Sequence, residues 1–339
     1  MKSFLIFLAG CFYIQLSLCQ NIDSAQFYYG KGTEASKANL FAIAATNFDK
    51  AISFNSNLTD AYIENGKAAL EMRMIDKANQ NFSKAYELDS NNNEVIYQLA
   101  TLSFNNHQFQ KAIHLAQKCI KCGHTSRILG MSYYSLEDYG KAEKYLKEYI
   151  AKNAPDALVV YTLGRTYLEL EDEKSAILQY QNAIDLELKS QWIYELALIY
   201  YNQDDYTNAL KYFDLAQNEG YPKSNDFYEN YGFAQLYSGN VENGIKTLNI
   251  VLERKPNNKE LMKNIAYAMY HTKKYSEALI YFEKILNITP KDAPTLYMIG
   301  LSFQKMGQKE KGQKICDNAI ILDPSLKMYR QKKEIPQGL

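Results

Sequence analysis

Small residues recur along this 339-residue chain at an almost constant spacing. Successive members of the series stand 34, 34, 30, 34, 33, 35, 34 and 34 residues apart. The series is Gly32, Gly66, Ala100, Gly130, Gly164, Ala197, Gly232, Ala266 and Gly300. A second small residue follows each member by twelve positions, at Ala44, Ala78, Ala112, Ala142, Ala176, Ala209, Gly244, Ala278 and Gly312. A period of this length predicts a repeat protein, in which one small unit packs against the next.

Two further patterns indicate what each unit is. A bulky side chain stands four residues after the second small residue in most units, at Phe48, Phe82, Leu146, Tyr180, Phe213, Leu248 and Phe282, but not at Ala116 or Cys316. Asp138 and Asp172 stand where a carboxylate can cap a helix, and Pro256, Pro290 and Pro324 stand where a helix must end. We therefore expect two antiparallel helices per unit, whose backbones approach closely at the small residues.

These combined columns resemble the tetratricopeptide repeat family, from Ala25 to about Pro324. The resemblance implies an all-α fold, a right-handed solenoid of nine helix hairpins. The expected units are residues 25–58, 59–92, 93–122, 123–156, 157–189, 190–224, 225–258, 259–292 and 293–324. Residues 325–339 are expected to form a polar capping helix and a tail, because the last unit of a solenoid needs a cover.

The step from Ala100 to Gly130 is four residues short. We expect a tight connection between the second helix of unit three and the first helix of unit four. Tyr149 also replaces a small residue in unit four. A change in superhelical curvature around units three and four is the expected result.

The first nineteen residues have the pattern of an export signal. Lys2 precedes an apolar run too short for a membrane-spanning helix, and the run ends at Cys19 with small residues at the cleavage positions. Cleavage after Cys19 is the main expectation; lipidation at Cys11 or Cys19, or a retained anchor, are the alternatives. The chain is expected to be exported, and to be periplasmic or associated with the outer membrane if bacterial, or otherwise secreted.

The composition excludes several classes of function. Lys and Arg number 38, as do Asp and Glu, so the formal net charge is zero and no long-range field attracts nucleic acid or an anionic membrane. No P-loop, H-E-x-x-H or G-x-S-x-G motif is present. We therefore expect no enzymatic activity, no cofactor and no catalytic or metal-binding residues.

A cluster of cysteines and histidines near position 120 is the one reactive-looking feature. Cys119 and Cys122 are expected to be a structural disulfide or plain thiols. A redox pair would sit at a helix N-terminus, whereas this pair is expected at the C-terminal end of a helix. A zinc site using His114 and His124 is a further alternative. Cys316 falls in the bulky column and is expected to be a buried thiol.

The family's concave face is lined by the first helix of each unit, and that face is the expected binding site. Positions three before, one after and four after the small residue give an aromatic, partly charged groove. The candidate residues are Tyr97, Phe104, Arg127, Tyr134, Tyr161, Arg165, Tyr194, Tyr201, Phe233, Lys263, Tyr267, Tyr270 and Tyr297. Tyrosine suits a half-wet contact surface. The hypothesis is a scaffold that binds a peptide or helix of another protein; the alternative is a glycan-binding protein using the same rings, and some of these tyrosines are expected to fill gaps between helices.

Overall fold

The computed structural model describes residues 23–119, 122–123 and 125–332. Over these residues the chain is built of helices joined by short turns, with no strand. The expected leader, with Cys11 and Cys19, lies outside the described residues, as do His124 and residues 333–339. The chain divides into two compact units, Met1–Gln179 and Tyr180–Leu339.

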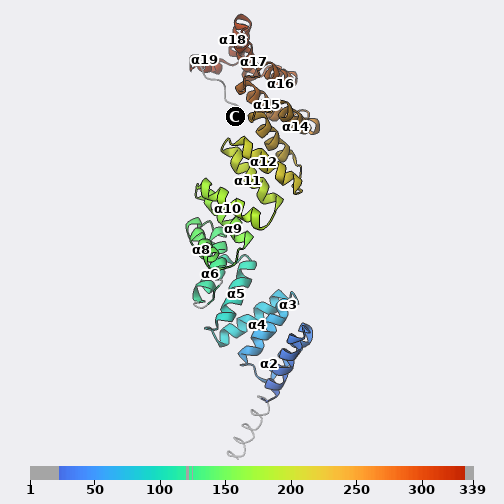
Figure 1. Ribbon diagram of the computed structural model, residues 1–339, viewed down its shortest axis with the longest axis vertical. Coiled ribbons are helices and arrows are strands. Elements are labelled where there is room, and N and C mark those ends of the chain that lie inside the picture. Colours follow the sequence, from blue (N-terminus) through green and yellow to red (C-terminus); the bar gives the residue numbers. More distant parts are fainter. Residues whose placement is uncertain (1–22, 120–121, 124, 333–339) are drawn as a thin grey trace, which may run out of the picture. The chain divides into compact units, whose positions relative to one another are not determined.

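The first unit is a series of paired helices (Figure 1). We call the first helix of each pair the A helix and the second the B helix. A helix over residues 23–37 is followed by α2 (Phe41–Phe54), α3 (Thr59–Glu71), α4 (Ile75–Leu88), α5 (Asn93–Asn105), α6 (Phe109–Lys118), α7 (Thr125–Ser135), α8 (Tyr139–Lys152) and α9 (Ala157–Glu169). The next helix, α10 (Glu173–Leu186), begins in the first unit and ends in the second.

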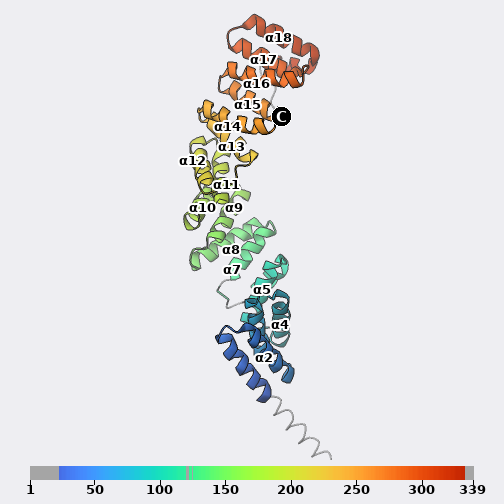
Figure 2. The same ribbon diagram turned by 90° about the vertical axis from the view of Figure 1, so that its right-hand side faces the viewer.

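The second unit continues the same alternation. Its helices are α11 (Ser190–Asn202), α12 (Tyr206–Asn218), α13 (Asn225–Tyr237), α14 (Val241–Arg254), α15 (Lys259–His271), α16 (Tyr275–Ile288), α17 (Ala293–Lys305) and α18 (Lys309–Leu322). A short 3-10 helix, η1 (Pro324–Leu326), leads into α19 (Lys327–Lys332). Helices α12, α14 and α16 each pack along their own A helix and against the next A helix, so α15 to α18 stack in order (Figure 2). This is the expected all-α solenoid of helix hairpins.

The two small residues of a unit lie where its helices touch. A Cβ atom built on Gly244 of α14 would stand 2.8 Å from the backbone oxygen of Gly232 and 2.8 Å from the backbone nitrogen of Leu236. The side chain of Leu248 lies directly over Gly232, where a Cβ would stand 2.7 Å from its Cγ. The small pair and the bulky side chain are therefore one contact, in which the side chain fills the space beside two closely packed backbones.

In the described part of the chain, the turn after each A helix contains a residue with left-handed backbone. These residues stand seven positions after the small residue, at Asn39, Arg73, His107, Glu137, Glu171, Asp204, Gly239, Lys273 and Gly307. Only two of the nine are glycine, although a left-handed conformation costs other residues roughly 1–2 kcal/mol. Backbone hydrogen bonds close these turns: at Arg73, its own N–H donates to the carbonyl of Leu70 at 2.9 Å, and the N–H of Met74 donates to the carbonyl of Ala69 at 2.8 Å. The left-handed residue is thus part of a helix-capping turn that is used at each hairpin.

Unit three shows how the short repeat step is accommodated. Helix α6 has 10 residues, whereas α4 and α8 each have 14. The connection that follows α6 runs from 119 to 124, longer than the 89–92 connection before α5. The expectation of a tight connection is wrong: the four missing residues come out of the B helix. Cys119 and Cys122 accordingly lie beyond the end of α6 and not along it. The expected change of curvature stays a prediction.

The helix contact predicts opposite effects for two glycine substitutions. Gly244→Ala should lower the free energy of unfolding by about 1–3 kcal/mol, because the new methyl group meets backbone atoms that cannot rotate away. Gly140→Ala in α8 has nothing within 4 Å and should be neutral or stabilising by up to about 1 kcal/mol. Urea unfolding followed by circular dichroism measures both, and equal midpoints for the two variants would contradict the close approach.

Candidate binding surface

Aromatic pairs bridge the turn between the A and B helices of four hairpins. In each pair, a ring from the last turn of the A helix contacts the ring that begins the B helix. The pairs and their centroid distances are Phe104–Phe109 at 5.8 Å, Tyr134–Tyr139 at 5.9 Å, Tyr201–Tyr206 at 5.7 Å and Tyr270–Tyr275 at 5.3 Å. Such tilted and edge-on arrangements are the favoured geometry for aromatic rings. The predicted groove residues of the last turn therefore belong to a repeated two-ring element.

The B-helix partner of each pair was missed by the sequence reasoning, which searched the A helices alone. A signal was present, because Phe109, Tyr139, Tyr206 and Tyr275 all stand nine residues after the small A-helix residue. Phe41 occupies the same position in the first hairpin. A search of the position nine residues after each small A-helix residue would have identified these aromatic residues.

In the first unit, the predicted charged residues are engaged within the chain. The Nε of Arg127 in α7 donates to Oδ2 of Asp156 at 2.9 Å. The same Asp156 caps α9 by accepting from the backbone nitrogens of Leu158 and Val159. Arg165 lies over the ring of Tyr134, with its Cζ 5.6 Å from the centroid. These contacts link neighbouring A helices.

The remaining predicted residues of the first unit differ in exposure. Tyr97 is half-buried and lines a small hollow of about 210 Å³ together with Glu94 and Cys122. Phe104 is half-buried in its aromatic pair. Tyr161 is buried in α9. Some of the predicted groove residues of the first unit are therefore engaged in packing between helices.

The second unit gathers four rings from two adjacent hairpins. Tyr201 contacts Tyr206, the ring of Tyr206 stacks on Tyr237 at 5.3 Å, and Tyr237 stacks on Phe233 at 6.2 Å. We call these four residues the aromatic cluster. Tyr237 is 38% exposed, and Tyr201 and Tyr206 are half-buried. Tyr201 and Phe233 were predicted from the sequence; Tyr206 and Tyr237 were not. The cluster presents rings from α11, α12 and α13 on one surface.

The phenols of the aromatic cluster are neutral over the physiological range. Burial raises the pKa of Tyr201 to about 12. Burial also raises the pKa of Tyr206 well above its usual range, and its hydrogen bond to Oδ1 of Asp204 at 2.5 Å acts in the same direction. Neutral phenols combine an apolar ring with a hydroxyl that donates or accepts a hydrogen bond.

Tyr194 lies in the packing between α11 and α13. Its ring is buried and stacks on Tyr221 at 4.1 Å. Its hydroxyl accepts a hydrogen bond from Nδ2 of Asn230 at 2.8 Å. The structure does not bring Tyr194 into the aromatic cluster, and its contacts serve to join two hairpins.

The last predicted residues belong to α15 and α17. Tyr267 is half-buried with its ring edge-on to Phe282 at 5.8 Å, and Lys263 is half-buried on the same helix. Tyr270 and Tyr297 are buried, but both line a hollow of about 440 Å³ near the C-terminal end of the unit. Side chains that form the floor of a hollow can be covered by neighbours and still define its shape.

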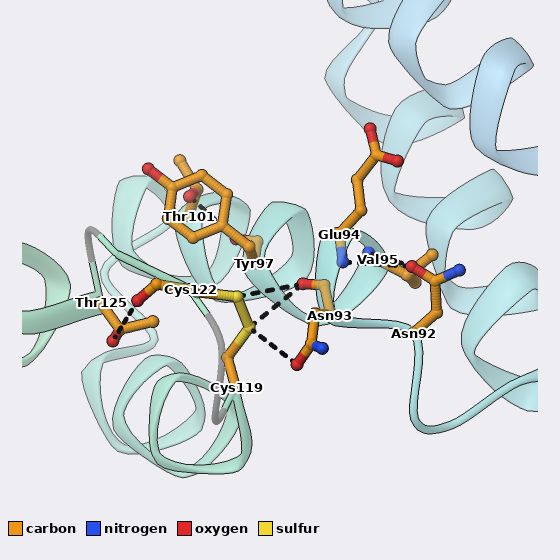
Figure 3. Close-up of a disulfide and its surroundings, with 9 residues drawn as sticks. All are labelled: Asn92, Asn93, Glu94, Val95, Tyr97, Thr101, Cys119, Cys122 and Thr125. Atoms are coloured by element: carbon orange, nitrogen blue, oxygen red, sulfur yellow. Dashed lines mark hydrogen bonds between the residues drawn. A yellow bond between two sulfur atoms is a disulfide. The ribbon is translucent and has the colours of Figure 1, made fainter.

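Cys119 and Cys122 form a disulfide (Figure 3). Their Cα atoms are 5.5 Å apart, within the range that a disulfide requires. Both sulfur atoms face the backbone oxygen of Asn93, the first residue of α5, at 3.1 Å and 3.3 Å. The disulfide therefore occupies the place beside α5 where the missing last turn of α6 would pack.

Two further findings concern the described residues as a whole. They contain no group of three or more His, Cys, Asp or Glu side chains arranged to hold a metal ion. They also contain no helix with both the length and the apolarity of a membrane span.

Cys316 is buried with its Sγ 3.6 Å from the backbone oxygen of Tyr297, and burial raises the pKa of the thiol to about 11.

Family models match much of the chain. The model described as "Tetratricopeptide repeat" matches residues 129–187, 161–225 and 233–293. The model described as "Anaphase-promoting complex, cyclosome, subunit 3" matches residues 71–149.

Several individual proteins are similar to this chain, among them these three. "Protein CTR9 homolog" of Arabidopsis thaliana is 20% identical over 85% of this chain, which spans 31% of that protein. "Protein O-mannosyl-transferase TMTC3" of Homo sapiens is 27% identical over 45% of this chain, which spans 18% of that protein. The C-terminal part of a repeat-containing protein from Cytophaga hutchinsonii superposes with a TM-score of 0.50 at 21% identity, covering 67% of this chain and 95% of the other. That superposition supports the same fold.

The disulfide predicts a stability that depends on redox conditions. Reduction should lower the free energy of unfolding by about 2 kcal/mol, since the bridge no longer restricts the unfolded chain. The reductant should have no effect on a Cys119→Ser, Cys122→Ser variant, which serves as the control. Urea unfolding with and without reductant makes the comparison. Ready alkylation of both cysteines in the native, non-reduced protein would contradict the bridge.

Proposed function

Because the chain belongs to the tetratricopeptide repeat family, we propose that it is a scaffold without catalytic activity that binds a segment of another protein across its A helices. The observation that carries this proposal is the aromatic cluster. Its rings come from two successive hairpins, so a segment crossing those helices meets the exposed Tyr237 and the half-buried Tyr201 and Tyr206, which pack over the buried Phe233. The human transferase match covers 18% of that protein and gives no reason to assign its activity to this chain.

The chemistry of the cluster suits a peptide. Tyrosine offers a large contact area with few rotatable bonds, so little entropy is lost when a ligand binds. The neutral hydroxyls can pair with the amides and carbonyls of a peptide backbone. Asp204, which accepts from Tyr206, adds a carboxylate at the edge of the cluster. Aromatic residues of this kind carry much of the binding energy in protein interfaces.

We further propose that the scaffold acts outside the cytoplasm, in an envelope complex if the host is bacterial. The support is the pattern of residues 1–19, with a basic start, a short apolar run and small residues before Cys19. The disulfide agrees with an oxidising compartment, where such bonds persist.

The binding proposal predicts that the aromatic cluster is needed for peptide affinity. Random peptides displayed on phage should include binders that are enriched on the full chain. A Tyr206→Ala, Tyr237→Ala variant should bind the enriched peptides at least about tenfold more weakly, because two contact rings are lost. Fluorescence anisotropy with labelled peptides measures the dissociation constants.

Tyr86→Ala is the matched control for this experiment. Tyr86 is a half-buried tyrosine on a B helix, and its hydroxyl accepts from Nζ of Lys118 at 3.1 Å. Its removal should leave peptide affinity unchanged. The proposal is wrong if no peptide is enriched, or if a folded double variant binds as tightly as the native chain.

The export proposal predicts a defined mature N-terminus. Intact mass spectrometry of protein purified from its native host should show a chain that begins at Gln20, because the cleavage pattern ends at Cys19. An added lipid mass on Cys11 or Cys19 would indicate an anchor instead. A cytoplasmic chain that retains Met1 would sink the proposal.

A further inference from the structure

The hollow near the C-terminal end of the second unit is lined by five helices and one turn. Tyr270 of α15, Tyr297 and Gln304 of α17, and Gln313 of α18 contribute to its walls. The capping helix α19 closes one side with Tyr329 and Arg330. Its volume of about 440 Å³ lies within the usual range for ligand sites. An adjoining hollow shares Gln304, Lys305 and Gln313 with it.

The side of the hollow formed by α19 is held in place by one arginine. A guanidinium nitrogen of Arg330 lies 2.7 Å from Oδ1 of Asp317 in α18. Arg330 also interacts with the phenol of Tyr297, whose side chain is only 2% exposed. Leu326, the last residue of η1, is buried and packs in the same hydrophobic cluster as Tyr297. The cap thus shapes the hollow while its own charge is neutralised by Asp317.

The charge that remains in the hollow is positive. Lys273 and Lys305 line it and are exposed, together with the imidazole of His271. Among the described residues, none that lines it carries a carboxylate. Within the described part of the chain, neither lysine forms an ion pair with a carboxylate within 4 Å. Lys309 adds a third ammonium group in the adjoining hollow, beside the single carboxylate of Glu310.

The other polar groups of the hollow are neutral. Burial raises the pKa of Tyr270 to about 12, and burial keeps the thiol of Cys316 protonated. Neither group therefore offsets the lysine charges near pH 7. The side-chain amides of Gln304 and Gln313 can each donate and accept, as the groups of a peptide backbone require.

We propose that this hollow binds an acidic segment of the partner protein, with carboxylates at Lys273 and Lys305 and backbone groups at the two glutamines. This inference rests on the proposed function, since it names the chemistry of the bound segment. A peptide is favoured because the amides and phenols match its backbone, and because the neutral chain as a whole has no field to attract a polyanion such as nucleic acid. The site is separate from the aromatic cluster of α11 to α13.

The test uses a designed probe and the full chain. The probe is a fluorescein-labelled peptide of about eight residues that alternates glutamate with phenylalanine and serine. The matched peptide carries glutamine in place of glutamate. The acidic peptide should bind the native chain at least about tenfold more tightly in low salt, and the difference should shrink as salt is raised.

Charge reversal locates the binding. A Lys273→Glu, Lys305→Glu variant should bind the acidic peptide about tenfold or more weakly than the native chain does. Its affinity for the glutamine peptide should be unchanged. Glutamate already occupies the same left-handed turn position at Glu137 and Glu171, so the change at 273 is compatible with the fold. The control reverses the exposed Lys246 and Lys284, on α14 and α16, with the same change in net charge. A Lys305→Gln variant, which removes one charge without repulsion, should give an intermediate loss.

The outcomes separate this inference from the proposed function. Equal affinity for the two probes, or equal losses in the Lys273/Lys305 and Lys246/Lys284 variants, would overturn the acidic site. Peptides enriched on the aromatic cluster would still support the scaffold in that case. If acidic peptides bind at Lys273 and Lys305 while no peptide depends on Tyr206 and Tyr237, the acidic site stands and the cluster does not.

Discussion

The structure depends on the close approach of two helix backbones at a pair of small residues. At Gly232 and Gly244 there is no room for a methyl group, and Leu248 fills the adjoining space. This contact sets the distance between the A and B helices, and a short turn with one left-handed residue, closed by backbone hydrogen bonds, joins them. The same turn brings the last ring of the A helix against the first ring of the B helix. The binding surface is thus a consequence of the helix contact that holds each hairpin together.

The sequence was sufficient for the fold because the helix contact repeats. The columns at Gly232, Gly244 and Leu248 recur in nearly every unit, so the hairpins and their order could be predicted from spacing alone. The left-handed turns could not, because residues as different as Arg73, Asp204 and Lys273 adopt them. The shortening of α6 was also misjudged: spacing shows that four residues are absent, but only packing decides whether a helix or a loop loses them.

The candidate site was predicted only in part, for a physical reason. Position on an A helix predicts the direction of a side chain but not what covers it. Tyr194 and Tyr201 both stand at predicted groove positions of α11. Tyr221, from the connection after α12, covers Tyr194, whereas Tyr201 is half-buried. The basic hollow joins Lys273, Lys305 and Arg330 from three segments far apart in sequence. No periodic column contains such a set, because the capping helix stands outside the repeat.

The short helix α6 affects the local stability of its hairpin. Each unit of a repeat protein contacts only its neighbours. Its stability is therefore approximately a sum over the single units and the contacts between neighbours. Helix α6 has 10 residues where α8 has 14, so less helix surface is available to pack within its own hairpin. The disulfide between Cys119 and Cys122 contacts the backbone oxygen of Asn93, so it holds the chain that follows α6 against the start of α5. The redox state of this disulfide would therefore determine how firmly the end of this hairpin is held, without changing the contacts of the other hairpins.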